Sequence, residues 1–199
     1  VARGRLTVVP MVGWRRPMRW TDTGLKWVQT SPEIADFGAV MGYAMTGLGC
    51  ELNHFTHGVG SEYWFRGISN SLIRPDILQR ELRALRLPGL DYRIISAPNG
   101  RTRQMGTGLY IEVTDWDEWQ PADLSFELMR LACRMEPRNP YANPTRAQAS
   151  RFLHEMGCAA LFRDLAEHGA RVDIGAYLRR WRIEDAHYRE ASRRFWLYP

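Results

Sequence analysis

The last third of the sequence predicts helices only, and this constrains the fold more than any other feature. Helical patterns occupy residues 125–135, 146–152, 158–167 and 174–195. Strand patterns are short and lie earlier, at residues 6–10, 92–95 and 109–114. The sequence therefore predicts an α+β fold, in which a small mixed sheet is packed with helices and the C-terminal third is helical.

Two more helices are expected in the first half of the chain. Residues 75–86 place apolar side chains along one face, and Pro88-Gly89 follow as a stop signal. A second helix is expected to begin at Ser31-Pro32 and to end near Gly47. Between Gly47 and Gly60 the chain is too rich in glycine and polar groups for a regular element, so we expect a half-buried loop.

Length and composition predict one folded domain over residues 1–199. Hydrophobic residues make up 45% of the 199 residues and charged residues 25%, which excludes a disordered chain. No apolar run approaches the roughly 20 residues of a membrane span. The three cysteines lack metal-binding spacing, so we expect buried free thiols and no metal or organic cofactor.

Charge permits an anionic partner, but its distribution argues against nucleic acid. The net charge is +5, yet the arginines are scattered among carboxylates and form no long basic run. We therefore expect no nucleic-acid partner. Residues 1–5 contain no initiator methionine and no signal-peptide pattern, which favours a mature or truncated start.

Candidate chemistry is concentrated in the glycine-rich loop, because no P-loop, GxSxG, GxGxxG or HExxH motif is present. Acid, base and hydrogen-bonding groups follow one another there: Glu51, Asn53, His54 and His57, with Gly58 and Gly60. Such a loop can supply general acid–base chemistry. It can equally be a turn whose polar side chains satisfy its own backbone, and the sequence leaves both interpretations open.

A second candidate region lies near the start of the chain. Arg15 and Arg16 stand between Trp14 and Trp20, and flat aromatic rings with cations are suited to sugar rings and carboxylates. The alternative is a solvated basic loop.

Several runs of the sequence resemble one family. They are VVPMVGWRRPMRWTDTGLKWVQTSPEI, CELNHFTHGVG, LRLPGLDYR, YIEVTDWDEWQP and RRFWLYP. Together, and in the same order, they resemble the C-terminal part of the NamZ-type exo-β-N-acetylmuramidases, bacterial glycoside hydrolases once listed as a domain of unknown function. The resemblance spans nearly the whole chain.

The resemblance implies an activity that this chain shares with a partner domain. Family members are about twice as long, with a Rossmann-like N-terminal domain before a region like this one. They release N-acetylmuramic acid from the non-reducing end of peptidoglycan fragments, in a cleft between the two halves. We therefore expect a muropeptide or glycan fragment as ligand, an absent N-terminal domain as partner, and no activity of this chain alone. A role in cell wall recycling and a secreted or periplasmic location are also implied.

The resemblance also ranks the candidate residues. Glu51 is the first catalytic candidate and His57 the second, and Arg15 and Arg16 are candidates to bind the lactyl carboxylate of muramic acid. Asn53, His54, Gly58 and Gly60 complete the expected substrate-binding set. Where many relatives have asparagine, glutamate and arginine, this chain has His54, His57 and Val59. The rival hypothesis is a non-catalytic module that binds glycans or a partner protein.

Overall fold

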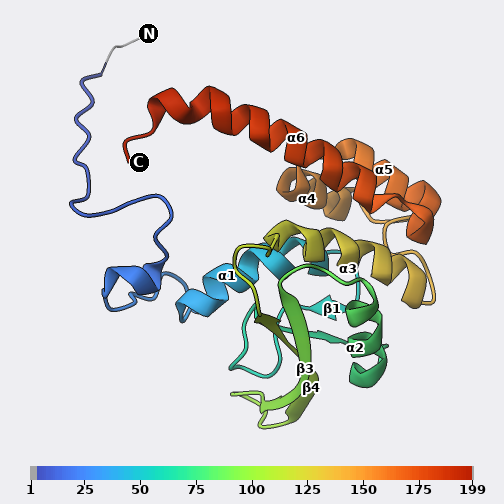
Figure 1. Ribbon diagram of the computed structural model, residues 1–199. Helices are drawn as coiled ribbons and strands as arrows, with labels where there is room; N and C mark the ends of the chain where they lie inside the picture. The colour runs from blue at the N-terminus through green and yellow to red at the C-terminus, as the bar shows by residue number, and fades with distance from the viewer. Residues whose placement is uncertain (1–3, 199) are drawn as a thin grey trace.

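Figure 1 shows the computed structural model, which describes residues 4–198. The expectation of a mature or truncated start concerns residues 1–5, of which residues 1–3 lie outside the described part. Pro199, the last residue of the RRFWLYP run, also lies outside it. The α+β class is confirmed. Residues 4–198 form six α-helices: α1 (Phe37–Thr46), α2 (Pro75–Ala84), α3 (Pro121–Met135), α4 (Arg146–Met156), α5 (Ala159–His168) and α6 (Ile174–Ser192). None of the helices described is long and apolar enough to cross a membrane.

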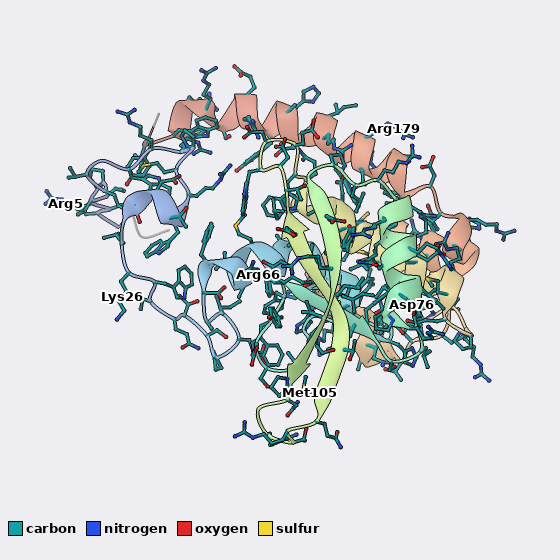
Figure 2. All side chains as sticks on the ribbon, turned by 60° about the horizontal axis from the view of Figure 1, so that its bottom comes forward. Arg5, Lys26, Arg66, Asp76, Met105 and Arg179 are labelled. Atoms are coloured by element: carbon teal, nitrogen blue, oxygen red, sulfur yellow. The ribbon has the colours of Figure 1, made fainter. Side chains whose placement is uncertain are left out.

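The sheet has four strands, in the order β1-β2-β4-β3. They are β1 (Phe55–Thr56), β2 (Gly67–Asn70), β3 (Leu90–Pro98) and β4 (Met105–Val113). All three pairings are antiparallel, so the expected mixture of strand directions is wrong. The pair β3–β4 is a long hairpin that runs in register from Leu90↔Val113 to Pro98↔Met105, and Figure 2 labels Met105 near its tip.

Helix α3 lies between the two hydrophobic cores and contributes to both. Leu124, Leu128 and Leu131 share one face and pack against the sheet, α1 and α2. Phe126 and Met129 lie on another face and pack against α4, α5 and α6. Because apolar residues surround α3, it forms the central layer between the sheet and the helical C-terminal third (Figure 1).

Helix α1 begins later than the sequence pattern predicts. The expected start at Ser31-Pro32 is wrong: the helix starts at Phe37, and the Asp36 side chain accepts a hydrogen bond from the Ala39 backbone N–H at 2.8 Å. Asp36 therefore caps the helix, as aspartate is suited to do. The end is as expected, since Gly47 follows the last helical residue.

The N-terminal arm, residues 4–19, forms no strand, so the strand predicted at residues 6–10 is wrong. Leu6 and Val9 are 86% and 85% exposed, and none of the described strands pairs with them. A β-branched run needs a neighbouring strand to satisfy its backbone, and the described chain supplies none here. Leu6, Val8 and Val9 instead form an exposed apolar run on the N-terminal arm.

The C-terminal segment after α6 contacts the N-terminal arm. The Arg16 guanidinium lies over the Trp196 ring, 3.6 Å from its centroid, and the Met11 backbone N–H donates to Tyr198 Oη at 2.7 Å. Figure 1 shows these two segments side by side at the end of α6. The N-terminal arm and the C-terminal segment therefore hold each other in place through these two contacts.

Candidate functional site

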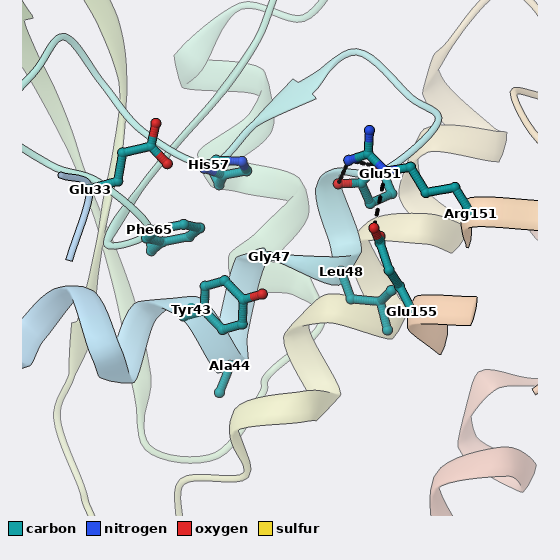
Figure 3. A pocket seen from close by; sticks show the side chains of 10 residues that line it. All are labelled: Glu33, Tyr43, Ala44, Gly47, Leu48, Glu51, His57, Phe65, Arg151 and Glu155. Atoms are coloured by element: carbon teal, nitrogen blue, oxygen red, sulfur yellow. Dashed lines mark hydrogen bonds and ion pairs between the residues drawn. The ribbon is translucent and has the colours of Figure 1, made fainter. Parts of the chain in front are cut away.

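A pocket of about 460 Å³ lies beside the glycine-rich loop, at the C-terminal end of α1 (Figure 3). We call it the Glu51 pocket. It is lined by Glu33, Tyr43, Ala44, Gly47, Leu48, Glu51, His57, Phe65, Arg151 and Glu155. The structure thus brings together Glu51 and His57, the two catalytic candidates.

A buried tyrosine forms a hydrogen bond with the backbone of the loop that carries Glu51. A 3₁₀ helix, Leu48–Cys50, precedes Glu51, and the Tyr141 hydroxyl donates to the Glu51 carbonyl at 3.4 Å. Burial raises the pKa of Tyr141, so its hydroxyl stays protonated. The backbone of Glu51 is therefore fixed while its side chain, 25% exposed, reaches the pocket.

His57 forms a wall of the pocket together with Phe65. The two rings are stacked, with centroids 4.5 Å apart, and Tyr43 meets the edge of Phe65 at 4.9 Å. His57 Nδ1 is buried, with no hydrogen-bond partner among residues 4–198. A buried polar atom normally has a partner, so His57 Nδ1 departs from the usual pattern.

The opposite wall carries an arginine between two carboxylates. Arg151 Nη2 lies 3.4 Å from each Glu51 oxygen, and Arg151 Nε donates to Glu155 at 3.0 Å. These carboxylates raise the pKa of Arg151, and the hydrogen bond that Arg151 donates to Glu155 is the largest cause. Figure 3 shows Glu33 on the far side of the pocket, near His57. The pocket therefore offers three carboxylates, one imidazole and one cation to a ligand.

Asn53 and His54, predicted to bind substrate, do not line the pocket. The Asn53 amide donates to the Gly49 carbonyl and to Tyr141 Oη, both at 2.9 Å. His54 Nδ1 lies 2.9 Å from the buried Glu136 carboxylate, which also accepts from the His54 backbone N–H. The Asn53 amide thus satisfies a carbonyl of its own loop, whereas His54 connects the loop to Glu136 just after α3.

Gly58 and Gly60 also lie outside the pocket lining and serve close packing. A Cβ at Gly58 would lie 3.3 Å from the Trp64 ring. Gly60 has a φ of +62°, and a Cβ there would lie 2.7 Å from the carbonyl oxygens of Ala97 and Pro98. Only glycine allows the loop to approach β3 so closely.

Arg15 and Arg16 are placed on the N-terminal arm and line no part of the Glu51 pocket. Arg15 is exposed, and Arg16 stacks on Trp196 as described above. The structure therefore does not bring the two predicted carboxylate-binding arginines to the catalytic candidates.

Sequence reasoning missed Glu33, Arg151 and Glu155. Glu33 lies where the sequence pattern predicts the first turn of a helix, but that helix starts at Phe37. Arg151 and Glu155 have the i, i+4 spacing of an ordinary surface ion pair, and no local pattern connects them with a loop 100 residues away.

The described residues contain no metal-binding constellation. No group of three or more His, Cys, Asp or Glu within residues 4–198 is placed to hold an ion. Cys50, Cys133 and Cys158 are free, as expected, although each is half-buried. Burial raises the pKa of Cys133 to about 12, so this thiol remains protonated at neutral pH.

Comparison with known proteins divides the chain into two parts. Residues 41–198 match the model of the C-terminal region of exo-β-N-acetylmuramidase NamZ, and residues 2–38 match the model of its N-terminal region. Glu33 belongs to the second match, and the other pocket residues belong to the first.

Two relatives support the same relationship. Over 137 residues the chain is 29% identical to the peptidoglycan β-N-acetylmuramidase NamZ of Bacillus subtilis (strain 168), covering 67% of this chain and 33% of that protein. A crystal structure of a DUF1343 family protein from Bacteroides fragilis matches the fold with a TM-score of 0.79 at 21% identity, over 94% of this chain and 49% of that one. This chain spans about a third to a half of the length of these relatives. On the match over residues 41–198, the chain belongs to the NamZ family of exo-β-N-acetylmuramidases.

Proposed function

We propose that this chain is the C-terminal part of an exo-β-N-acetylmuramidase that releases N-acetylmuramic acid from the non-reducing end of peptidoglycan fragments. The Glu51 pocket is its contribution to the substrate cleft, and an N-terminal domain completes the active site. Glu51 is the first candidate to act on the substrate, and His57 is the second.

The observation that carries this proposal is the composition and position of the Glu51 pocket. Glycosidases act through carboxyl groups on either side of the scissile bond. Glu33 and Glu51 lie on different sides of the pocket, and the rings of Phe65 and Tyr43 line it. Ligand sites favour domain interfaces, and residues from both family matches line this pocket.

The exposed apolar residues of the N-terminal arm support the proposal that another domain covers this surface. Leu6, Val8 and Val9 are exposed, and they belong to the segment that matches the N-terminal family model. Exposed apolar runs mark surfaces that another element covers. We therefore expect the 199-residue chain alone to leave a chromogenic N-acetylmuramic acid glycoside uncleaved. Turnover well above buffer, abolished by a substitution in this chain, would overturn the proposal that an N-terminal domain completes the active site.

The decisive experiment is Glu51→Gln in the complete two-domain protein, measured with that glycoside. The amide keeps the shape of the side chain but removes its charge. If Glu51 transfers a proton or stabilises charge, kcat falls roughly 10²- to 10⁴-fold. If it only binds ground-state hydroxyls, KM rises and kcat is nearly unchanged.

A matched control separates chemistry from folding. Glu155→Gln changes the other carboxylate on Arg151, and its side chain is more exposed than that of Glu51. We expect a smaller kinetic effect from it and an unchanged melting temperature. Normal kinetics for Glu51→Gln would remove Glu51 from the site, and a lower melting temperature with normal kinetics would assign it to the loop alone.

The second candidate function is a non-catalytic glycan- or partner-binding module. One observation favours it: Arg151 contacts both oxygens of Glu51, which suits a carboxylate that binds rather than one that transfers protons. In that case, joining the chain to an N-terminal domain of the family would restore ligand binding but no hydrolysis.

A further inference from the structure

We propose that the groove between α1 and β4 is a separate binding site, which accepts the carboxylate of an acidic sugar and binds it through Arg66. This α1–β4 groove has a volume of about 460 Å³. Its polar groups are Thr21, Asp36, Arg66, Tyr110 and Glu112, and most of its other lining residues are apolar or aromatic. The choice of an acidic sugar rests on the proposed function.

Arg66 differs from every other arginine of residues 4–198. Only Arg66 and Arg130 are half-buried, and the rest are exposed. Arg130 is paired with Glu127 at 2.6 Å. Within the described residues, no carboxylate oxygen lies within 4.0 Å of the Arg66 guanidinium nitrogens. A half-buried cation without a counter-charge is costly, and a bound anion would offset that cost.

The Arg66 guanidinium is held in place before any ligand arrives. It lies over one ring, that of Tyr110, with 4.7 Å between the guanidinium carbon and the ring centroid. On its other side it packs against Gly38, where any added side chain would collide with it. A planar guanidinium fixed between a ring and a helix backbone presents its remaining donors at a defined angle. Figure 2 shows Arg66 in the space between α1 and the hairpin β3–β4.

The two carboxylates of the groove already have partners. Glu112 accepts from Arg93 Nε at 3.2 Å, and Asp36 caps α1. They therefore leave the donors of Arg66 unengaged. Their negative charge also disfavours a dianion such as phosphate, so one arginine in this setting matches a monoanionic carboxylate.

The remaining walls of the α1–β4 groove suit a sugar ring attached to that carboxylate. Trp116 offers a flat indole, which the Arg19 guanidinium covers on one side at 4.7 Å. Met41, Val113 and Phe37 add apolar surface. The volume lies within the range of small-molecule pockets, in which apolar walls surround a few placed polar groups. Muramic acid has this composition, since it joins a sugar ring to a lactyl carboxylate.

The test compares two free sugars that differ in the lactyl group. N-acetylmuramic acid and N-acetylglucosamine are titrated into the ¹⁵N-labelled 199-residue chain and followed by NMR. We expect N-acetylmuramic acid to bind more tightly and to shift the amide signals of Gly38, Tyr110 and Glu112. Arg66→Gln should weaken its binding roughly 10- to 100-fold. Arg74→Gln, which removes an exposed arginine at the start of α2, should leave it unchanged.

Each other outcome decides against the site. Equal affinity for the two sugars, shifts confined to Gly47 and Leu48 of the Glu51 pocket, or equal effects of Arg66→Gln and Arg74→Gln would overturn it. Should the Arg66→Gln variant unfold, Arg66→Lys is the substitute, because it keeps the charge and removes the planar guanidinium. The affinity of the Arg66→Lys variant for N-acetylmuramic acid must then be lower than that of the wild type. Because free-sugar binding needs no turnover, binding at this groove without hydrolysis by the two-domain protein would overturn the proposed function alone. Hydrolysis without binding here would overturn this inference alone.

Discussion

The imidazole of His57 lies flat on the ring of Phe65, with the two planes inclined by only 11°. Phe65 holds this position with a φ of +59°, a conformation that costs energy for a residue with a side chain. The Thr46 hydroxyl donates to the Phe65 carbonyl at 2.9 Å and so fixes the strained residue to α1. One wall of the Glu51 pocket is therefore anchored to a helix rather than to a free loop.

Phe65→Leu should lower the free energy of unfolding more than an equivalent change elsewhere in the core. Loss of an aromatic neighbour costs about 0.5 to 1.5 kcal/mol beyond the loss of buried area. Phe55→Leu is the matched control, because Phe55 is equally buried and none of the described aromatic pairs includes it. Urea unfolding of both variants measures the difference. Equal losses would show that the stack adds nothing to stability.

Gly42→Ala should destabilise the protein although alanine favours helices. A Cβ at this position would lie 2.5 Å from the Phe65 carbonyl carbon, and backbone cannot move aside as a side chain can. Overpacking of this kind costs about 1 to 3 kcal/mol, more than the gain in helix propensity of up to about 1 kcal/mol. Gly175→Ala in α6 meets only side-chain atoms and should be neutral or stabilising. A stabilised Gly42→Ala variant in thermal unfolding would contradict this packing.

Trp196→Ala should release the N-terminal arm. It removes the ring on which Arg16 stacks, so trypsin should cleave after Arg15 several times faster, whereas the Arg16–Pro17 bond resists trypsin in every variant. Phe195→Ala is the control, because Phe195 is exposed and stacks only with its neighbour Arg194. Mass spectrometry of timed digests locates the cuts, and equal rates for the two variants would rule out this fastening.

Asp91→Asn should make a small, pH-dependent difference to stability. The Arg83 side chain lowers the pKa of Asp91 from its ordinary value of 3.8 through a bidentate contact at 2.9 and 3.2 Å. Because the pKa is lower in the folded state, the ionised pair stabilises the fold above pH 3.8, and this is lost as pH falls through the lower folded-state value. The pair is largely exposed, so the expected loss at pH 7 is at most about 0.5 kcal/mol.

Urea unfolding from pH 7 to pH 2.5 checks the sign of this effect. The difference between wild type and Asp91→Asn should vanish at the acid end. Arg83→Gln should keep a residual loss there, since Arg83 also donates to the Tyr92 carbonyl at 3.0 Å. A difference that grows toward acid would contradict the assignment.

Elements with their own strong pattern were predictable from the sequence, and elements made by tertiary pairing were not. Helix α2 was predicted from its apolar face and its proline start, and the structure begins it at the same Pro75. Strand β2 was missed because its four residues, GISN, show no alternation and pair only through contacts with β1 and β4. Residues 6–10 show the reverse case, a strand pattern without a partner strand.

The same distinction applies to the Glu51 pocket. Glu51 and His57 were found together because they share one short loop. Glu33 and Arg151 come from other elements, and only the folded chain brings them to that loop. The polar neighbours Asn53 and His54 show the limit of residue type as a signal, because the same side chains that suit a ligand also suit a buried turn.

The anchoring of Phe65 decides where the pocket can vary. Gly42, Thr46 and the Phe65 backbone meet so closely that few substitutions fit on that side. Arg151 and Glu155 are exposed side chains of α4, so they can be exchanged with little effect on packing. Directed evolution toward larger or differently charged ligands should therefore accumulate its changes on α4 and conserve the wall beside α1.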